Sequence, residues 1–194
     1  MVCVREICMH ASADVAGNAD DVAAIKRFRE ALLAQNWPDS ETVRSIVGRS
    51  SDTGVDSKFS CIGTSENIQM FGVWAGYEYG GYRYPPFQFL KGSLVNPRLS
   101  ELMEALARQP GLHPSYDKSG WERAFWLYQP RGRLSIQSLA LRAAKFKDVL
   151  EDPQSFADLP NEARTPAEVF SGDHQAVIDL ANEDADQQTR GNRD

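Results

Sequence analysis

The chain has 194 residues, of which 42% are hydrophobic, and this is enough for one ordinary domain or two small ones with a substantial core. Its formal net charge of −6, from 21 basic and 27 acidic residues, disfavours a protein whose main task is to neutralise nucleic-acid phosphates. No run approaches the roughly 18 apolar residues of a membrane span and residues 1–16 lack a secretory pattern, so we expect a cytoplasmic protein without a membrane partner.

Residues 1–18 form a polar leader that we expect to be flexible. The chain has three cysteines, an odd number that fits free thiols in a reducing compartment better than a disulfide framework. Two of them, Cys3 and Cys8, lie near His10, but this spacing matches no standard metal site and a fourth ligand is missing. We therefore predict neither a metal nor another cofactor.

Two short helices follow the leader. Asp20 or Asp21 can cap the first, which ends near Gln35 or Asn36 and whose apolar residues recur at helical spacing: Val22, Ile25, Phe28 and Leu32. Trp37 and Pro38 then break the chain. Asp39 or Ser40 can start the second helix, which Gly48 closes and which turns Val43, Ile46 and Val47 inward. Two short helices joined by a tight break predict a helix-turn-helix-like unit.

The segment after Gly48 is where a DNA-recognition helix belongs, yet it is rich in Ser, Thr, Asp and Gly and is a poor helix former. The nearby cations that would contact DNA are Arg44, Arg49 and Lys58, a thinner basic face than a DNA-binding protein usually offers. DNA binding is therefore weakly supported.

Residues 71–90 are unusually aromatic and predict a short β-hairpin. Ile68 to Trp74 is rich in strand formers, Ala75 and Gly76 suit a turn, and Tyr77 to Tyr84 returns until Pro85 and Pro86 end the pairing. Stacking on bases would require basic residues among the rings, and only Arg83 lies there. We expect these rings to belong to a core hairpin.

The next two helices have clear boundaries. Asn96 and Pro97 suit the start of the first, whose stripe is Leu99, Leu102, Met103 and Leu106. Ser119 and Glu122 are expected to form a capping box for the second, which Pro130 ends and in which Trp121, Ala124, Phe125 and Tyr128 share a face.

The remaining chain is less regular until residue 165. Leu139 to Leu150 has the pattern of an amphipathic helix. Thr165, Pro166 and Glu168 supply the cap, first-position proline and capping glutamate of a short helix, and Asp173 can cap a last helix that contains Val177, Ile178 and Leu180. From about Glu183 onward the polar chain is expected to be a disordered tail.

These elements predict a mainly α fold with one short β-hairpin. We divide the chain into a flexible leader (1–18), a helix-turn-helix-like unit with the hairpin (19–90), a helical unit (91–182) containing an insertion (131–163), and a disordered tail (183–194).

Three segments in this order carry a resemblance to a known family: YRYPPFQF (82–89), GWERAFWLYQP (120–130) and ARTPAEVFSGDHQAVIDLA (163–181). Together they resemble the Xre/MbcA/ParS antitoxin family with its toxin-binding domain, over roughly residues 28–181. The resemblance implies a bacterial antitoxin or immunity protein that silences a partner toxin. In the best-known pairs the toxin is an NAD-consuming RES-domain enzyme, and the antitoxin's carboxy-terminal segment covers its cleft.

The chain departs from the family pattern in two places. The position of the recognition helix is degraded. The segment from Arg131 to Ala163 has 33 residues, whereas the family places only a few residues before its TPxE motif. The toxin-facing surface is therefore expected to differ.

We expect the toxin contacts in the carboxy-terminal half, where the resemblance places the toxin-binding domain and where aromatic and arginine anchors are available. The candidate toxin-binding residues are Trp126, Tyr128, Arg131, Arg133, Arg164, Asp173, His174 and Asp179.

Two other function classes compete with this interpretation. Catalysis is disfavoured because His10, His113 and His174 lie outside any nucleophile or metal motif and no glycine-rich phosphate loop is present, so we predict no enzyme. A DNA-binding regulator, acting on a toxin–antitoxin operon, is the alternative that the helix pair at 20–49 supports. The expected partner is a cognate toxin, while a homodimer and DNA stay open.

Overall fold

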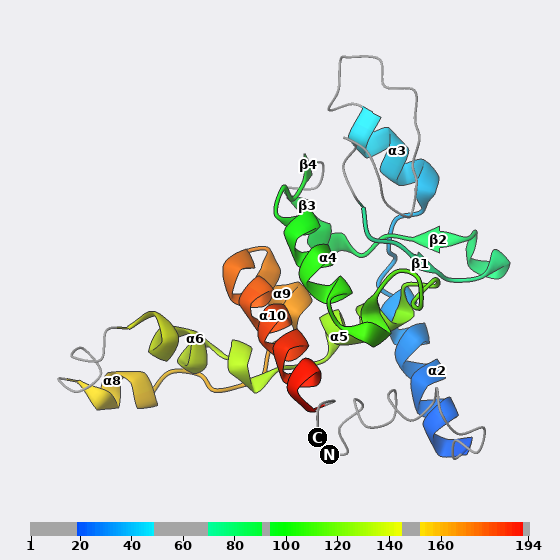
Figure 1. The fold of residues 1–194 in the computed structure, drawn as a ribbon. Coiled ribbons are helices and arrows are strands. Elements are labelled where there is room, and N and C mark those ends of the chain that lie inside the picture. Colours follow the sequence, from blue (N-terminus) through cyan, green and yellow to red (C-terminus); the bar gives the residue numbers. More distant parts are fainter. Residues whose placement is uncertain (1–18, 49–69, 91–93, 145–151, 192–194) are drawn as a thin grey trace.

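A computed structural model describes residues 19–48, 70–90, 94–144 and 152–191. It confirms a mainly α-helical protein, to which two short antiparallel hairpins add the strands (Figure 1). In the described part of the chain no helix is both long and apolar enough to cross a bilayer.

Helices α2 (Ala19–Leu33) and α3 (Ser40–Gly48) are joined by the predicted break. The chain turns at Asn36, whose φ is 55°, and Trp37 inserts into the core with 2% of its surface exposed. Asp39 caps α3 as expected, because its Oδ1 accepts the N–H of Thr42 at 2.8 Å. Val22 departs from the apolar face expected for α2. It is 62% exposed, because the first turn of the helix extends past the core.

The first hairpin has shorter strands and a longer loop than expected. Strand β1 (Val73–Trp74) pairs with β2 (Tyr82–Arg83), and residues 75–81 connect them through a 3₁₀ turn, η1 (Tyr77–Tyr79). Three glycines of this loop adopt positive φ, which ends the strand geometry early: Gly76, Gly80 and Gly81. Trp74 then donates its N–H to the carbonyl of Ser119 at 2.8 Å, so this hairpin is tied to the helical unit.

A second hairpin, not expected from the sequence, follows the double proline. The 3₁₀ turn η2 (Pro86–Gln88) leads into β3 (Phe89–Leu90), which pairs with β4 (Leu94–Val95). The fully buried amide of Gln88 accepts the N–H of Phe71 at 2.9 Å and donates to its carbonyl at 2.8 Å. The glutamine of the YPPFQF segment therefore satisfies the backbone of the segment that leads into β1 and has a structural role.

Helix α4 (Leu99–Ala107) buries the predicted leucine stripe, and the 3₁₀ turn η3 (Pro110–Leu112) ends it. The capping box predicted for the start of α5 (Trp121–Tyr128) is wrong, because the side chain of Ser119 does not cap the helix. The buried carboxylate of Asp117 instead accepts the N–H groups of Glu122 at 3.3 Å and Arg123 at 3.0 Å. Gly120, with φ of 79°, lets the chain turn between that carboxylate and the helix.

The last two helices begin as predicted. Thr165 and Glu168 form a capping box for α9 (Pro166–Phe170), and the carboxylate of Asp173 accepts the N–H of Ala176 at 3.0 Å at the start of α10 (His174–Gly191). The expected disordered tail is wrong as far as Gly191, because α10 continues through it; residues 192–194 lie outside the described part.

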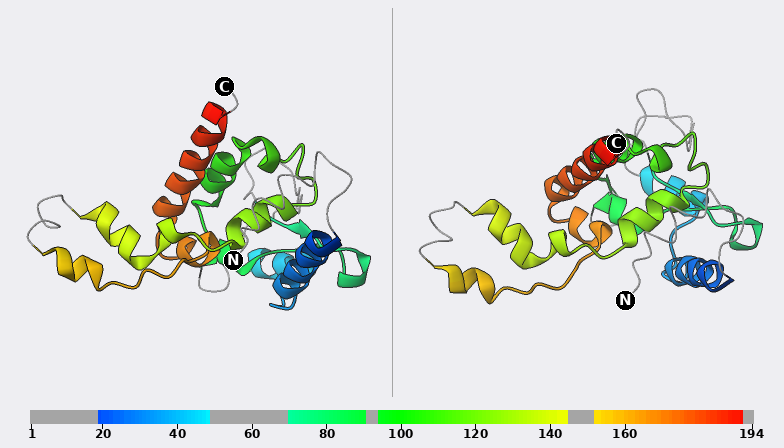
Figure 2. Two further views of the ribbon diagram at one scale, coloured as in Figure 1. Left: turned by 90° about the horizontal axis from the view of Figure 1, so that it is seen from below. Right: turned by 60° about the horizontal axis from the view of Figure 1, so that its bottom comes forward.

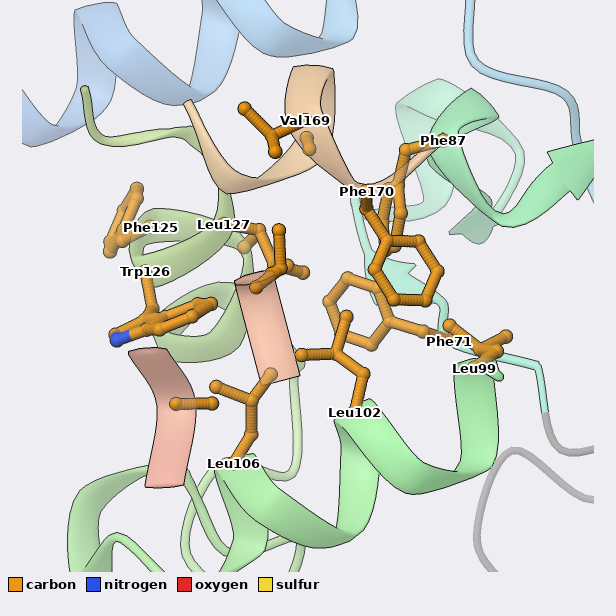
Figure 3. Close-up of a cluster of buried hydrophobic side chains, with 14 of the residues drawn as sticks. Phe71, Phe87, Leu99, Leu102, Leu106, Phe125, Trp126, Leu127, Val169 and Phe170 are labelled. Atoms are coloured by element: carbon orange, nitrogen blue, oxygen red, sulfur yellow. The ribbon is translucent and has the colours of Figure 1, made fainter. Parts of the chain in front are cut away.

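One apolar core joins both predicted units. Phe71 and Phe87 from the hairpin region pack among side chains of α4, α5, α9 and α10 (Figure 3). Leu32 of α2 and Trp37 belong to the same cluster. The boundary expected near residue 90 therefore does not separate two cores.

The insertion forms an arm, which we define as residues 132–163 and whose described parts are 132–144 and 152–163. It contains the 3₁₀ turn η4 (Gly132–Leu134), α6 (Ile136–Ala143) and α8 (Pro153–Ala157), and it projects away from the body in every view (Figures 1 and 2). Helix α6 begins three residues earlier than predicted because Ser135 caps it by accepting the N–H of Ser138 at 3.1 Å. The helix ends at Ala143 and Ala144 is extended, so the unbroken helix predicted from Leu139 to Leu150 is wrong; residues 145–150 lie outside the described residues.

Candidate partner-binding surface

The arm leaves and rejoins the body at one point. The N–H of Arg131 donates to the carbonyl of Arg164 at 2.8 Å, and the two residues form an isolated antiparallel bridge. Two predicted site residues, 33 positions apart in the sequence, are thereby neighbours at the base of the arm.

A buried carboxylate lies beside this point. Asp184 of α10 is 3% exposed, and its Oδ2 accepts the indole N–H of Trp126 at 2.9 Å. The guanidinium of Arg131 lies 3.9 Å from the same oxygen and 5.5 Å from the centre of the Trp126 ring. A buried charge is costly unless it is paired and hydrogen-bonded, so this set holds α5, the arm base and α10 together.

Trp126, one of the predicted partner contacts, is buried in the structure. Its side chain is 5% exposed and its single donor is already used by Asp184. A partner that docks on the folded surface does not reach it, and its role is to support the arginine beside it.

Glu183 connects the arm to the outside of α10. Its carboxylate accepts hydrogen bonds from Arg133 and, at 2.9 Å, from Arg142 of α6. Arg133 and Arg142 are 51% and 39% exposed, so solvent screens both ion pairs and each contributes at most about 1 kcal/mol. Their main effect is to set the direction in which α6 leaves the body.

The other side of α10 is fastened to α4 by two arginines. Arg98 donates to Gln175 at 2.7 Å, and Arg108 donates to Asn182 at 2.7 Å and to Asp186 at 2.6 Å. These bonds tie α10 to the residues that flank both ends of α4.

The other candidates on α10 lie away from the arm base. Asp173 and His174 start the helix, roughly two and a half turns before Glu183. The carboxylate of Asp173 caps α10, and Nδ1 of His174 donates to the carbonyl of Phe170 at 3.1 Å. Asp179 accepts a hydrogen bond from Gln175 at 2.8 Å. All three have a structural contact; Asp173 is exposed, and His174 and Asp179 are partly exposed.

Tyr128 lies mainly in the interior. Its ring centre is 5.2 Å from that of Trp37 and 6.5 Å from that of Phe87, and burial raises the pKa of its hydroxyl above the ordinary value. The structure thus brings Trp126, Arg131, Arg133 and Arg164 together at the arm base, and places Tyr128 and the start of α10 elsewhere.

The candidate DNA contacts are only partly described. Arg44 is exposed on α3, whereas Arg49 and Lys58 lie outside the described residues. Hydrogen bonding from Thr42 is the largest cause that lowers the pKa of the Asp39 carboxyl, so a negative charge stays at the start of α3. A DNA phosphate at this end of α3 would be repelled by that negative charge.

An open cavity of about 470 Å³ lies between the α2–α3 break and the hairpin loop. Its rim carries Asp39 and Arg83, whose charged groups are 3.8 Å apart and balance each other. Within the described ranges, no three His, Cys, Asp or Glu side chains gather in a way that could hold a metal ion.

Sequence reasoning missed the two residues that organise the arm base, Glu183 and Asp184. The polar composition from Glu183 onward predicts a disordered tail, in which neither residue stands out. A helical signal was present: Val177, Ile178, Ala181 and Ala185 continue one apolar face at helical spacing, and all four are buried.

Comparisons with protein-family models, curated proteins and solved structures found no match to this chain.

Proposed function

We propose that this protein is a bacterial antitoxin or immunity protein that binds a partner toxin and covers its active site. The proposed partner is an NAD-consuming enzyme of the RES type or a related toxin. The class of partner comes from the three-segment resemblance, and the location of the contact comes from the geometry of the arm base.

The observation that carries the proposal is that the three resembling segments meet around one residue. The ring of Phe87, from the first segment, lies 6.5 Å from Tyr128 of the second and 5.7 Å from Phe170 of the third. These segments are far apart in the sequence, and their contact supports the interpretation that they form one unit, as a toxin-binding domain requires.

The arm base and the adjoining face of α10 are the proposed contact surface. Arg133 is 51% exposed and lies beside the carboxylate of Glu183 on α10, and Arg164 is partly exposed at the base of the arm. Arginine is enriched among the residues that dominate protein interfaces, and a mixed pattern of charge gives specificity and orients the encounter. To inhibit the toxin, the protein needs only a surface that fits the toxin and fills its active-site cleft, because occlusion excludes the substrate without any chemical step.

The first test is affinity capture of the tagged protein from its native cytoplasm at about 0.5 M salt, which suppresses binding driven by phosphate charges. We expect one stoichiometric enzyme whose activity is inhibited in the complex. Recovery of nucleic acid alone, and only at low salt, would contradict the proposal.

Point variants then locate the surface. The double variant Arg133→Glu and Arg164→Glu should weaken the complex by at least about tenfold, since reversing charges at an interface costs on the order of 1.4 kcal/mol or more. Arg44→Glu is the matched control, because it reverses an exposed charge on α3. Deleting the chain from Thr165 onward is unsuitable, since it removes Phe170 and Leu180 from the core.

A DNA-binding regulator is the second candidate, favoured by the α2–α3 pair and its tight break. If DNA is bound, affinity falls steeply as salt rises and Arg44→Glu abolishes binding, whereas the Arg133/Arg164 variant leaves it intact. The same two variants thus separate the two functions.

A further inference from the structure

Two exposed guanidinium groups at the arm base share a single carboxylate. Arg133 and Arg142 both donate to Glu183, whose side chain is 37% exposed. The two arginines are themselves 51% and 39% exposed. Each guanidinium has more N–H donors than its share of one carboxylate can accept, so both keep donors that are open to solvent.

Arg164, which pairs with Arg131 through the backbone, has no carboxylate of its own. It is partly exposed, and its guanidinium forms no ion pair with any residue in the described ranges. Glu162 and Glu168 lie near it in the sequence, but Glu168 accepts the backbone N–H of Thr165 at 2.9 Å. The exposed side of the arm base therefore carries arginines whose charge the chain leaves only partly matched.

The interior of the arm base, by contrast, is balanced. Arg131 is 15% exposed and lies 3.9 Å from the buried carboxylate of Asp184. A partner does not need to neutralise this pair, because each charge already has an opposite charge beside it. The incompletely matched arginines lie outside it, where a docking surface can reach them.

We propose that the arm base receives an acidic segment of the partner toxin, whose carboxylates pair with Arg164 and with the open donors of Arg133 and Arg142. This inference rests on the proposed function, since it names the chemistry of the partner at the same surface. A guanidinium binds a carboxylate through two parallel hydrogen bonds, and exclusion of water at an interface strengthens such a pair.

The surface itself favours carboxylates over phosphates as the ligand. Glu183 shows that a side-chain carboxylate fits between Arg133 and Arg142, because it accepts hydrogen bonds from both. Glu183, Glu162 and Glu168 also place negative charges among the arginines. They repel a nucleic acid, which carries a phosphate at every nucleotide, whereas a folded protein can position single carboxylates between them.

The acidic contact is expected to make the complex depend on salt. Exposed ion pairs contribute little individually, but complementary charge accelerates and orients the encounter of two proteins. We expect the affinity for the toxin to fall by about tenfold between about 50 mM and 0.5 M salt, and apolar contacts to maintain the complex at the higher concentration.

Titration of the full chain with a hexaglutamate peptide at low salt, followed by the amide chemical shifts in NMR spectra, tests the inference without the toxin. We expect millimolar binding that shifts the amides of Arg133, Arg164 and Glu183. Peptide and protein are both anionic overall, so net charge opposes this binding and only a local site explains it. A hexalysine peptide, which the net charge attracts, should leave these three amides unshifted.

The result can be separated from that of the proposed function. Capture of a toxin together with no binding of hexaglutamate would retain the inhibitor and overturn the acidic contact. Binding of hexaglutamate without a captured toxin would retain the acid-binding surface but exclude a toxin as its ligand.

Point variants locate the binding. Arg133→Gln combined with Arg164→Gln should weaken hexaglutamate binding by about three- to tenfold, because two ion pairs are lost. Arg27→Gln is the matched control, since Arg27 is exposed on α2, away from the arm (Figure 1), and it should change the constant by less than about twofold. The dispersion of the amide spectrum verifies that each variant folds. No shift at the arm base up to about 10 mM peptide, equal binding by the double variant, or tighter binding of a six-residue oligothymidylate would each overturn the inference.

Discussion

A carboxylate that is almost fully buried needs partners, and Asp184 shows how one residue connects three elements. It accepts the indole N–H of Trp126 and lies next to Arg131, so it links α5, the arm base and α10. None of these contacts is local in sequence, which explains why a polar carboxy-terminal segment hid a core residue.

Trp126→Phe should lower the free energy of unfolding by about 1–3 kcal/mol. The change keeps an aromatic ring in the core but removes the donor that serves a buried carboxylate. Urea unfolding measures the effect. Tyr77→Phe, at a side chain that is 89% exposed, is the control and should stay within about 0.5 kcal/mol of wild type. Equal stability of Trp126→Phe and wild type would show that the hydrogen bond contributes nothing.

Glu122 gives a pH-dependent prediction. Burial raises the pKa of its carboxyl above the ordinary value, the charge of Asp117 raises it further, and Arg29 opposes both. The folded protein therefore binds this proton more tightly than the unfolded chain does. Protonated Glu122 makes its full contribution to the free energy of unfolding at pH values below the unfolded pKa, and this contribution is lost as the pH rises through the higher pKa of the folded state.

Glu122→Gln removes this titration. Relative to wild type, the variant should become progressively more stable as pH rises above about 4.5, until the wild-type carboxyl is fully ionised. Urea unfolding across a series of pH values gives the difference directly. Parallel stability profiles for the two proteins would rule out the proposed titration.

At the scale of elements, the start of α5 shows that a helix cap can be supplied from outside the expected motif. Asp117 caps the helix across a turn that Gly120 makes possible. A Cβ at Gly120 would lie 2.5 Å from the carbonyl oxygen of Gly72, so both conformation and space require glycine there.

Gly120→Ala should therefore destabilise the protein by more than about 2 kcal/mol, through the left-handed conformation and the clash together. Thermal and urea unfolding measure the loss. Gly111→Ala is the control, because nothing lies within 4 Å of its added Cβ, and it should have little effect. A similar stability for both variants would show that the backbone relaxes freely at Gly120.

At the scale of the whole molecule, the arm is an appendage on a single core. Its base is fixed by the Arg131–Arg164 bridge and by the two arginines on Glu183. The first turn of the arm belongs to that core, because Leu134 is fully buried in it and Leu139 of α6 packs against it.

Glu183→Gln should loosen the arm without unfolding the protein. Because both ion pairs are exposed, global stability should fall by no more than about 1 kcal/mol. Amide hydrogen exchange in α6 should become faster while exchange in α4 and α5 stays unchanged. A uniform increase across all helices would indicate that Glu183 supports the core instead.

The sequence determined the features that depend on neighbours within one or two helical turns. The capping box at Thr165, the cap at Asp173, the break at Trp37 and the leucine stripe of α4 are all local patterns, and the structure has them where they were expected. The three segments that carry the family resemblance were also legible from the sequence. That resemblance and the antitoxin function remain proposals.

Tertiary structure alone decided the rest, because it depends on pairs of groups that are distant along the chain. Gln88 hydrogen-bonds the backbone of Phe71, 17 residues away, and Asp184 of α10 accepts the indole N–H of Trp126, 58 residues away. The burial of Trp126 has the same origin: α5 is covered on several sides, so residues outside its predicted apolar face are also buried. Local periodicity places a side chain on a helix, but the surrounding elements determine whether that side of the helix meets solvent.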